Sequence, residues 1–137
     1  MMDGVELRKV NKIGDNRGNL FVAEYLKEIP FVVKRLYYIR DVSDIEIKRG
    51  LHSHKQLHQC FICMNGACTI IFDDGNDRET YLLDDPGDLL YIKPGIWREM
   101  QFSSKDTVLL VLASDVYSES DYIRNYNEFI NDKKVKQ

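Results

Sequence analysis

The sequence predicts an all-β sandwich or jelly-roll barrel that ends in one short helix. Turn-forming groups of Asp, Asn, Gly and Pro recur at short intervals through most of the chain. Between these turns lie short runs rich in β-branched and aromatic residues, which favour strands. Only near the C-terminus do apolar residues recur at helical spacing. Many short strands with regular turns are typical of sandwiches and barrels.

The expected strands are the apolar runs themselves. They include residues 31–39, 59–64, 68–72, 89–92 and 107–112. Asn65-Gly66 predicts a hairpin, because both residue types tolerate a positive φ. Asp73-Asp74-Gly75 predicts that the next hairpin closes there.

A helix is expected from about residue 119 to residue 131. Its apolar positions recur at helical spacing, and they are Tyr122, Ile123, Tyr126, Phe129 and Ile130. Ser118 or Ser120 is available as the N-cap. We expect the basic segment 133–136 that follows to be a solvated tail.

The length and charge of the chain limit its class. A chain of 137 residues fits one domain, and we expect residues 1–137 to form it. A net charge of −3 does not point to nucleic acid or to an anionic membrane as a partner. No apolar stretch is long enough to cross a bilayer, and the N-terminus does not resemble a signal peptide. These features predict a cytoplasmic protein.

The three cysteines, Cys60, Cys63 and Cys68, are an odd set within one short stretch, which suits a reducing compartment. The Cys-x-x-Cys spacing also permits a redox interpretation. On a strand, however, Cys60 and Cys63 point to opposite faces, whereas thioredoxin-type cysteines stand at the start of a helix. We therefore expect buried, inert thiols.

All three histidines, His52, His54 and His58, lie within seven residues. His52 and His54 are two positions apart, so on a strand they share one face. Three interpretations are open. The histidines could lie on the surface without a role, bind a metal, or form an acid–base centre. Histidine gains and loses a proton near neutrality, so two rings on one face can serve two adjacent carbons of a substrate.

The metal interpretation rests on a resemblance to the cupin superfamily, whose metal-binding members use His-x-His-x3-Glu and a fourth histidine after a Pro-Gly turn. Here His58 takes the Glu position, and Arg98 takes the place of the fourth ligand. Arginine has no lone pair to donate, and its positive charge repels a cation. Three histidines could still hold iron or zinc, but the guanidinium argues against it, and we expect no metal.

Several segments in order resemble one family more closely. They are residues 31–39, Arg49 to Lys55, the Met64-Asn65-Gly66 turn, 72–75, Trp97 to Met100, 111–115 and Asp121 to Arg124. On these segments the chain resembles the dTDP-4-keto-6-deoxyglucose 3,4-ketoisomerases, the FdtA/QdtA or WxcM-like group. The resemblance runs from about residue 10 to about residue 130.

The resemblance implies a cupin jelly-roll barrel that forms a homodimer by exchange of N-terminal strands. It implies an isomerase that moves a ketone from C4 to C3 of a dTDP-linked 6-deoxyhexose, with no metal and no organic cofactor. The product of the family normally passes to a pyridoxal-phosphate (PLP) aminotransferase, which makes a 3-amino-3,6-dideoxy sugar for surface glycans such as O-antigen.

Residue roles follow from the same resemblance. His52 and His54 match the paired histidines of the family, and Tyr37 matches its active-site tyrosine. We expect His54 to move the carbon-bound proton, while His52 and Tyr37 shuttle hydroxyl protons and stabilise the enediolate. Alternation puts Arg35 on the strand face of Tyr37, where it could reach the diphosphate of the substrate.

Two arginines bear on the configuration of the product at C4. The galacto-type pattern has arginine in an early Arg-Gly turn and histidine after the conserved tryptophan. This chain carries Arg17 and Arg98, a mixture of patterns that leaves the configuration open. We expect both residues to contact the sugar. His58 departs from the glutamate common in the family, and either a third ring in the pocket or a residue at its rim would fit.

Three other functions remain as alternatives. A sugar-nucleotide 3,5-epimerase has a related barrel, but it relies on a His–Asp dyad, and no Asp neighbours His52 or His54 in sequence. A non-catalytic cupin that binds a sugar or a small acid is the second. A metal-dependent dioxygenase is the third.

Overall fold

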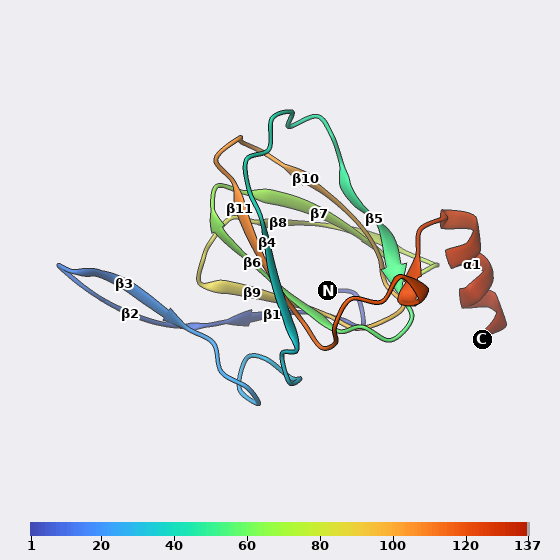
Figure 1. Ribbon diagram of the computed structural model, residues 1–137, viewed down its shortest axis with the longest axis horizontal. Helices are drawn as coiled ribbons and strands as arrows, with labels where there is room; N and C mark the ends of the chain where they lie inside the picture. Colours follow the sequence, from blue (N-terminus) through green and yellow to red (C-terminus); the bar gives the residue numbers. More distant parts are fainter. Residues whose placement is uncertain (137) are drawn as a thin grey trace.

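Two five-stranded antiparallel sheets face each other in the computed structural model, which describes residues 1–136 (Figure 1). The first sheet has the order β1 (Val5–Lys9), β9 (Asp88–Ile92), β6 (Gln59–Asn65), β11 (Val108–Ala113) and β4 (Arg35–Ile39). The second has the order β12 (Tyr122–Ile123), β5 (Arg49–His54), β10 (Trp97–Phe102), β7 (Cys68–Asp73) and β8 (Arg78–Leu83). This is the predicted jelly-roll barrel.

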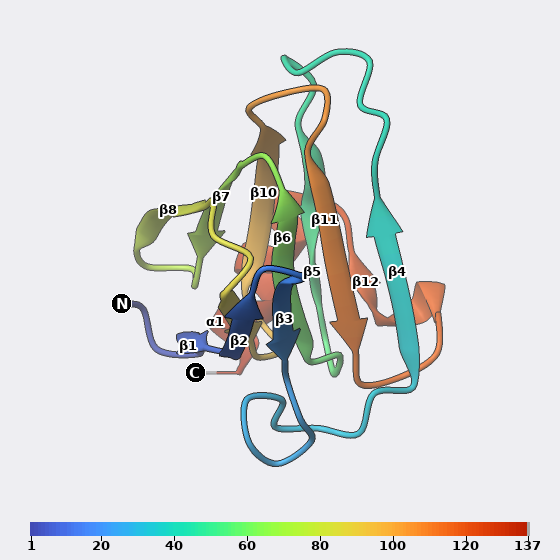
Figure 2. The ribbon, with the colours of Figure 1, turned by 90° about the vertical axis from the view of Figure 1, so that its left-hand side faces the viewer.

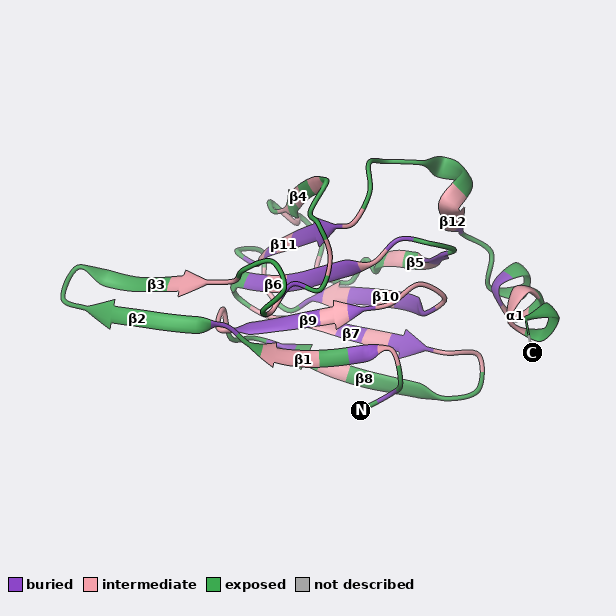
Figure 3. Ribbon diagram, turned by 90° about the horizontal axis from the view of Figure 1, so that it is seen from below, coloured by how far each residue is buried: buried purple, intermediate pink, exposed green. Residues whose placement is uncertain are grey.

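The core fills the space between the two sheets (Figure 3). Alternate residues of each strand point into it, as the period of two requires. Phe61 and Val111 come from the first sheet, and Ile70 and Met100 come from the second. Toward one end of the barrel, the inward-facing residues of the same strands are polar instead of apolar.

The third sheet is a hairpin of β2 (Asn11–Asp15) and β3 (Gly18–Val22), which projects away from the barrel (Figures 1 and 2). Every residue of β2 is exposed. The hairpin turns at Asn16-Arg17, between the paired residues Asp15 and Gly18.

Two strand expectations need correction. The strand expected over 31–39 begins at Arg35, which pairs with Ala113 where β11 ends. Before it, the backbone N–H of Lys34 still donates to the carbonyl of Ala113 at 3.0 Å, but residues 31–34 are not part of the ladder. Asn65-Gly66 does form a turn with a positive φ at Gly66, but not a hairpin. Both edges of β6 are occupied by β9 and β11, so the chain crosses to the other sheet. The β7–β8 hairpin after Asp73 is confirmed.

The helix expected over 119–131 is also wrong in its bounds. A 3₁₀ turn covers Glu119–Asp121, β12 follows, and α1 spans Tyr126–Val135. The N-cap is Asn125, whose side chain accepts from the backbone N–H of Glu128 at 3.0 Å, rather than Ser118 or Ser120. Most of the basic tail expected over 133–136 therefore belongs to the last turn of α1.

Helix α1 packs on the outside of the second sheet. Phe129 and Ile123 pack around Trp97, and the Tyr126 hydroxyl donates to Asp73 Oδ2 at 2.7 Å. These contacts hold β12 in place, because β12 pairs with β5 through only two residues. No helix in the described residues is long and apolar enough to span a membrane.

The cysteines lie as expected. Cys63 and Cys68 are in the core, and Cys60 points to the opposite side of β6 into a second apolar cluster. All three are free, and burial raises the pKa of Cys60 and Cys68 to about 12.

Candidate active site

The polar end of the barrel brings together inward-facing side chains from four strands. They are Arg35 and Tyr37 of β4, His52 and His54 of β5, Gln59 of β6 and Arg98 of β10. Strand pairing fixes their neighbours, since Arg98 lies opposite His52 in the β10–β5 ladder. Of the site residues that the sequence predicts, only Arg17 lies elsewhere.

The two histidine rings stand edge to face, with their centroids 4.8 Å apart. His52 Nδ1 lies 2.9 Å from the carbonyl oxygen of Gly50. A carbonyl only accepts, so Nδ1 carries the hydrogen and Nε2 keeps a free lone pair. Burial, followed by the positive charge of Arg98, lowers the pKa of His52 to about 4, so the ring is neutral at pH 7.

His54 has a partner that sequence reasoning missed. Its Nδ1 lies 3.0 Å from Oδ2 of Asp121, whose Oδ1 accepts from the backbone N–H of Gln56 at 2.8 Å. The carboxylate fixes the hydrogen on Nδ1, so Nε2 of His54 also has a free lone pair. That Nε2 is buried and has no partner in the described residues. Burial and the charge of Arg98 lower the pKa of His54 as well.

Arg98 is a buried cation without a carboxylate partner in residues 1–136. Its Nη2 donates to the carbonyl of Ile96 at 2.9 Å, and its Nη1 donates to Gln59 Oε1. Gln59 Nε2 in turn donates to the Tyr37 hydroxyl at 3.2 Å. Burial lowers the pKa of Arg98 to about 10 and raises that of Tyr37, so Tyr37 keeps its proton at neutral pH. A chain of hydrogen bonds thus connects the Arg98 guanidinium through Gln59 to the Tyr37 hydroxyl.

Two cavities open at this end, and Arg35 and Tyr122 line both. The first, of about 400 Å³, is also lined by Tyr37, His52 and Arg49. The second, of about 290 Å³, contains His54 along with Ser and Asp residues of the segment after β11. Nε and Nη2 of Arg35 are buried and have no partner in the described residues. A guanidinium with free donors beside a cavity is suited to binding an anion.

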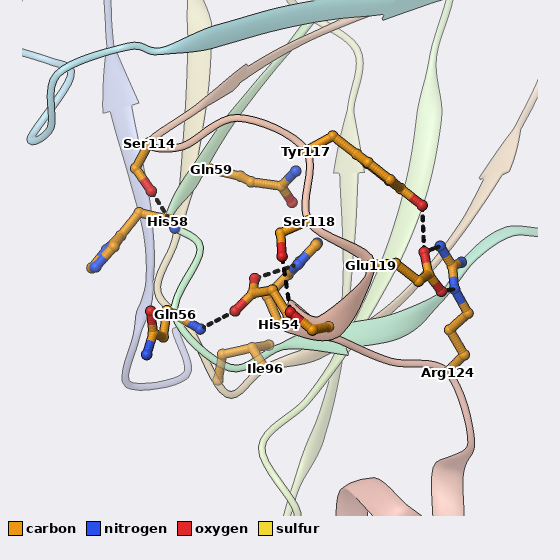
Figure 4. A network of polar contacts seen from close by, with 12 residues as sticks. His54, Gln56, His58, Gln59, Ile96, Ser114, Tyr117, Ser118, Glu119 and Arg124 are labelled. Carbon is orange, nitrogen blue, oxygen red and sulfur yellow. Dashed lines mark hydrogen bonds and ion pairs between the residues drawn. The ribbon is translucent and has the colours of Figure 1, made fainter.

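Tyr122 packs against both histidines, at 4.9 Å from His52 and 4.4 Å from His54 between ring centroids. Arg124 lies over the same ring at 4.1 Å and forms an ion pair with Glu119 (Figure 4). Tyr122 and Asp121 are therefore parts of the site contributed by the segment expected to be helical. The only sequence signal for them is their place in a segment that resembles the ketoisomerase family.

His58 and Arg17 lie outside the site of their own chain. His58 points away from His54 (Figure 4), and its Nδ1 lies 2.7 Å from the Tyr91 hydroxyl. It is therefore neither a third ring in the pocket nor a rim residue. Arg17 is exposed at the tip of the β2–β3 hairpin and pairs with Asp15.

The three-histidine set that the cupin motif would allow is not assembled. With His58 turned away, only two histidines face the barrel interior. In residues 1–136, no three His, Cys, Asp or Glu side chains gather as a metal-binding group. The buried charge of Arg98 opposes a cation at the same place.

Comparison with known proteins places this geometry in context. The family described as FdtA, WxcM-like, C-terminal, matches residues 3–134. The TDP-4-oxo-6-deoxy-alpha-D-glucose-3,4-oxoisomerase of Aneurinibacillus thermoaerophilus is 50% identical over 118 residues, which are 86% of this chain and 84% of that protein.

Two solved structures are similar over nearly the whole chain. QdtA, a sugar 3,4-ketoisomerase from Thermoanaerobacterium thermosaccharolyticum in complex with TDP, is 46% identical, with a TM-score of 0.94 and coverage of 99% of this chain and 98% of that one. The WlaRB TDP-quinovose 3,4-ketoisomerase from Campylobacter jejuni is 45% identical, with a TM-score of 0.90 and coverage of 95% and 99%.

Proposed function

The chain belongs to the FdtA (WxcM-like) family and is a 3,4-ketoisomerase of TDP-linked sugars, and from this premise we propose that it converts TDP-4-keto-6-deoxyglucose into the 3-keto isomer. The observation that carries the mechanism is the neutral histidine pair, in which Nδ1 of each ring faces an acceptor and His52 lines the same cavity as Tyr37. A 3-ketone accepts an amino group by transamination, so we expect a PLP aminotransferase to consume the product, for a 3-amino-3,6-dideoxy sugar of a surface glycan.

The proposed reaction moves two protons and needs no external oxidant. A histidine Nε2 takes the proton from C3, which the C4 ketone acidifies, and the electron pair of the C–H bond forms an enediolate with its charge on O4. The Tyr37 hydroxyl accepts from Gln59, so its own hydrogen is free to donate to that oxygen. The protonated histidine then returns its proton to C4, and the proton lost from O3 is passed to O4, which leaves a ketone at C3 and a hydroxyl at C4.

The burial of the two rings favours His52 for the carbon-bound proton. His52 is half-buried and lines the larger cavity with Tyr37, whereas His54 is 1% exposed and held by Asp121. A base must contact the substrate carbon to act on it. We therefore propose the reverse of the roles expected from sequence: His52 acts at carbon, and the His54–Asp121 pair moves the hydroxyl protons.

We propose that this chemistry needs no metal and no organic cofactor. The neutral histidines supply the bases, a ring that has taken a proton supplies the acid, and the buried Arg98 supplies the positive charge that a cation would otherwise supply. Arg35, with two free buried donors, is the proposed contact of the diphosphate. Arg98 lies opposite His52 in the ladder, so we also propose that it contacts the sugar and influences the C4 configuration.

We further propose a homodimer with exchanged N-terminal strands. A lone two-stranded hairpin is marginally stable in water, and Ile13 and Leu20 of the β2–β3 hairpin are 56% and 58% exposed. An apolar hollow on the first sheet, lined by residues such as Ile62, Met64 and Leu110, would be covered in the same assembly. The exchange would carry Arg17 toward the partner subunit. Light scattering should give twice the mass of the chain, and a monomer mass would contradict the proposal.

Epimerisation at C5 is the second candidate reaction. Epimerases rely on a His–Asp dyad, and Asp121 supplies the Asp partner of His54 that no sequence neighbour provides. Incubation with TDP-4-keto-6-deoxyglucose in deuterated water, followed by NMR, separates the candidates. A C3 ketone with deuterium at C4 supports the ketoisomerase. Deuterium at C5 with the ketone still at C4 supports the epimerase. Binding of the nucleotide sugar without any exchange would contradict the proposed reaction on this substrate. The free thiols suit the cytoplasm, where we expect the enzyme to act.

A further inference from the structure

Strand β5 contains one extra residue directly before His52. Arg98 of β10 pairs with His52, and the next residue, Glu99, pairs with Gly50, so Leu51 has no partner in β10. Two residues of one strand that oppose a single residue of its neighbour form a β-bulge. The bulge therefore lies immediately before the histidine pair.

The backbone of this bulge has two consecutive residues with a positive φ. The φ of Gly50 is 83°, and the φ of Leu51 is 56°. Glycine adopts such a conformation readily, but leucine rarely does, because its Cβ approaches the following carbonyl oxygen. Burial of the leucine side chain does not explain the conformation, since Leu51 is 43% exposed. A disfavoured backbone conformation without such an explanation points to a role of the backbone itself.

The bulge presents a backbone carbonyl to the ring of His52. In a regular antiparallel strand, carbonyl groups bond sideways to the neighbouring strands, whereas side chains stand roughly perpendicular to the sheet. A side chain therefore does not normally meet the carbonyl two residues earlier in its own strand. Here Nδ1 of His52 lies 2.9 Å from the carbonyl oxygen of Gly50. That oxygen belongs to the peptide unit between Gly50 and Leu51, whose orientation depends on the φ of Leu51.

This contact decides which ring nitrogen of His52 can act as a base. The carbonyl only accepts, so the hydrogen of the neutral ring stays on Nδ1 and the lone pair stays on Nε2. Without the carbonyl, the hydrogen could reside on either nitrogen, and a ring with its hydrogen on Nε2 cannot take a proton there.

The acceptor at His52 also differs in charge from the acceptor at His54. Nδ1 of His54 faces the carboxylate of Asp121, whereas Nδ1 of His52 faces an uncharged carbonyl. A carboxylate stabilises a protonated ring more than a carbonyl does. The carbonyl therefore fixes the tautomer of His52 and still allows the protonated ring to return its proton to the substrate.

We propose that the bulge at Gly50 and Leu51 positions the base of the reaction, because it holds His52 as the Nδ1–H tautomer with the lone pair on Nε2. Gly50 and Leu51 are thus positioning residues that act through His52. This proposal rests on the proposed function, in which His52 acts at carbon. Glycine suits position 50 for a second reason, because a Cβ there would lie 3.1 Å from the carbonyl oxygen of Arg98.

The first test determines the tautomer directly by NMR of protein with isotope-labelled histidine. A ring nitrogen that carries a hydrogen differs in chemical shift from one that carries a lone pair. The signals that are missing in His52→Asn identify His52. At neutral pH, His52 of the wild-type enzyme should be the neutral Nδ1–H tautomer. The Nε2–H tautomer, or a mixture of both, would overturn the proposal without any variant of the bulge.

The second test changes the backbone preference at position 51. Asparagine tolerates a positive φ and isoleucine does not. Leu51→Ile should lower kcat in proportion to the fraction of His52 rings that change to the Nε2–H tautomer, and it should leave the Kd for TDP unchanged. Leu51→Asn should keep the wild-type tautomer and kcat. Leu82→Ile is the matched control, because Leu82 is an exposed strand leucine without a positive φ.

Two outcomes of this second test would refute the role of the bulge. One is an equal population of the His52 tautomers in Leu51→Ile and Leu51→Asn. The other is a parallel loss of TDP binding and turnover in Leu51→Ile with the wild-type tautomer retained, which would show that the bulge only supports the shape of the pocket.

Turnover of TDP-4-keto-6-deoxyglucose separates this inference from the proposed function. Normal turnover by a wild-type enzyme whose His52 is the Nε2–H tautomer would refute the role of the bulge and leave the proposed reaction intact. A wild-type protein with the Nδ1–H tautomer that does not convert this sugar would refute the proposed reaction, and with it the role of His52 as the base.

Discussion

The two ends of the barrel interior are built on the same strands, yet they have opposite chemistry. Strand β10 carries Phe102 and Met100 in the apolar core and Arg98 in the site. Strand β6 begins with Gln59 at the polar end and continues with Phe61 and Cys63 in the core. The apolar end stabilises the fold, while the polar end buries groups that cost free energy unless they are paired. This enzyme therefore separates stability and catalysis along each strand rather than between elements.

The largest expected effect is loss of the proposed base. His52→Asn should lower kcat by about 10³-fold, the usual contribution of a general base, with little change in melting temperature. Turnover of the nucleotide sugar followed by NMR measures this. His58→Asn is the control, because His58 lies outside the site and should keep wild-type turnover. If His52→Asn remains fully active, His52 is not the base.

A matched leucine pair tests the apolar end. Leu83 is fully buried in the core, and its neighbour Leu82 is 53% exposed on the same strand. Leu83→Ala should lower the free energy of unfolding by about 3 kcal/mol, and Leu82→Ala should lower it by less than about 1 kcal/mol. Denaturant unfolding measures both. Equal losses would mean that the core at this end is not close-packed.

The His54–Asp121 pair allows a smaller test of the polar end. Asp121→Asn should lower kcat by about 10–100-fold, since an amide holds the His54 tautomer less firmly than a carboxylate. KM should change little. Asp115→Asn is a useful control, because Asp115 lines the smaller cavity without contacting either histidine. An unchanged kcat in Asp121→Asn would exclude Asp121 as a positioning residue.

The pH dependence follows from the lowered pKa of His52. The ring acts as a base only when neutral, and its pKa in the folded enzyme is about 4. As pH falls, kcat/KM should therefore decline near pH 4 rather than near the ordinary histidine pKa of about 6.5. A profile of kcat/KM between pH 4 and pH 8 measures this. A decline centred near pH 6.5 would mean that the ring is solvated in the free enzyme.

The smallest effect is expected where α1 joins the barrel. Tyr126→Phe removes the hydroxyl that donates to the buried Asp73, and it should cost about 1 kcal/mol of stability. Tyr38→Phe is the control, since the Tyr38 side chain is 62% exposed. Thermal unfolding compares the two variants. A loss in Tyr126→Phe no larger than in Tyr38→Phe would show that the hydroxyl does not stabilise the helix contact.

The inward rows of the barrel were predictable because a period of two fixes which residues share a face. On a strand, this period places His52 with His54, and Arg35 with Tyr37. Arg98 followed from its position in the cupin motif. The resemblance to the ketoisomerases supplied the reaction, which no spacing in the sequence specifies.

The other features of the site depend on tertiary contacts, which local sequence patterns do not encode. Asp121 and Tyr122 reach the histidines only because β12 pairs with β5, and the helical spacing of the C-terminal segment concealed that strand. Strand β5 also has an irregular register: Arg98 pairs with His52 and Glu99 pairs with Gly50, so Leu51 has no partner in β10 and the period of two is broken there. His58 does not share the face of His52 and His54, because it lies in the loop between β5 and β6, where the alternation of strand faces is interrupted.

The placement of Asp121 after the barrel strands has a consequence for how the enzyme becomes active during synthesis. All strands of the two sheets except β12 precede residue 114, so they leave the ribosome before Asp121 and Tyr122 do. A nascent barrel can therefore contain both histidines while His54 still lacks its carboxylate. We therefore expect His54 to gain its carboxylate only when the segment that carries Asp121 docks on β5.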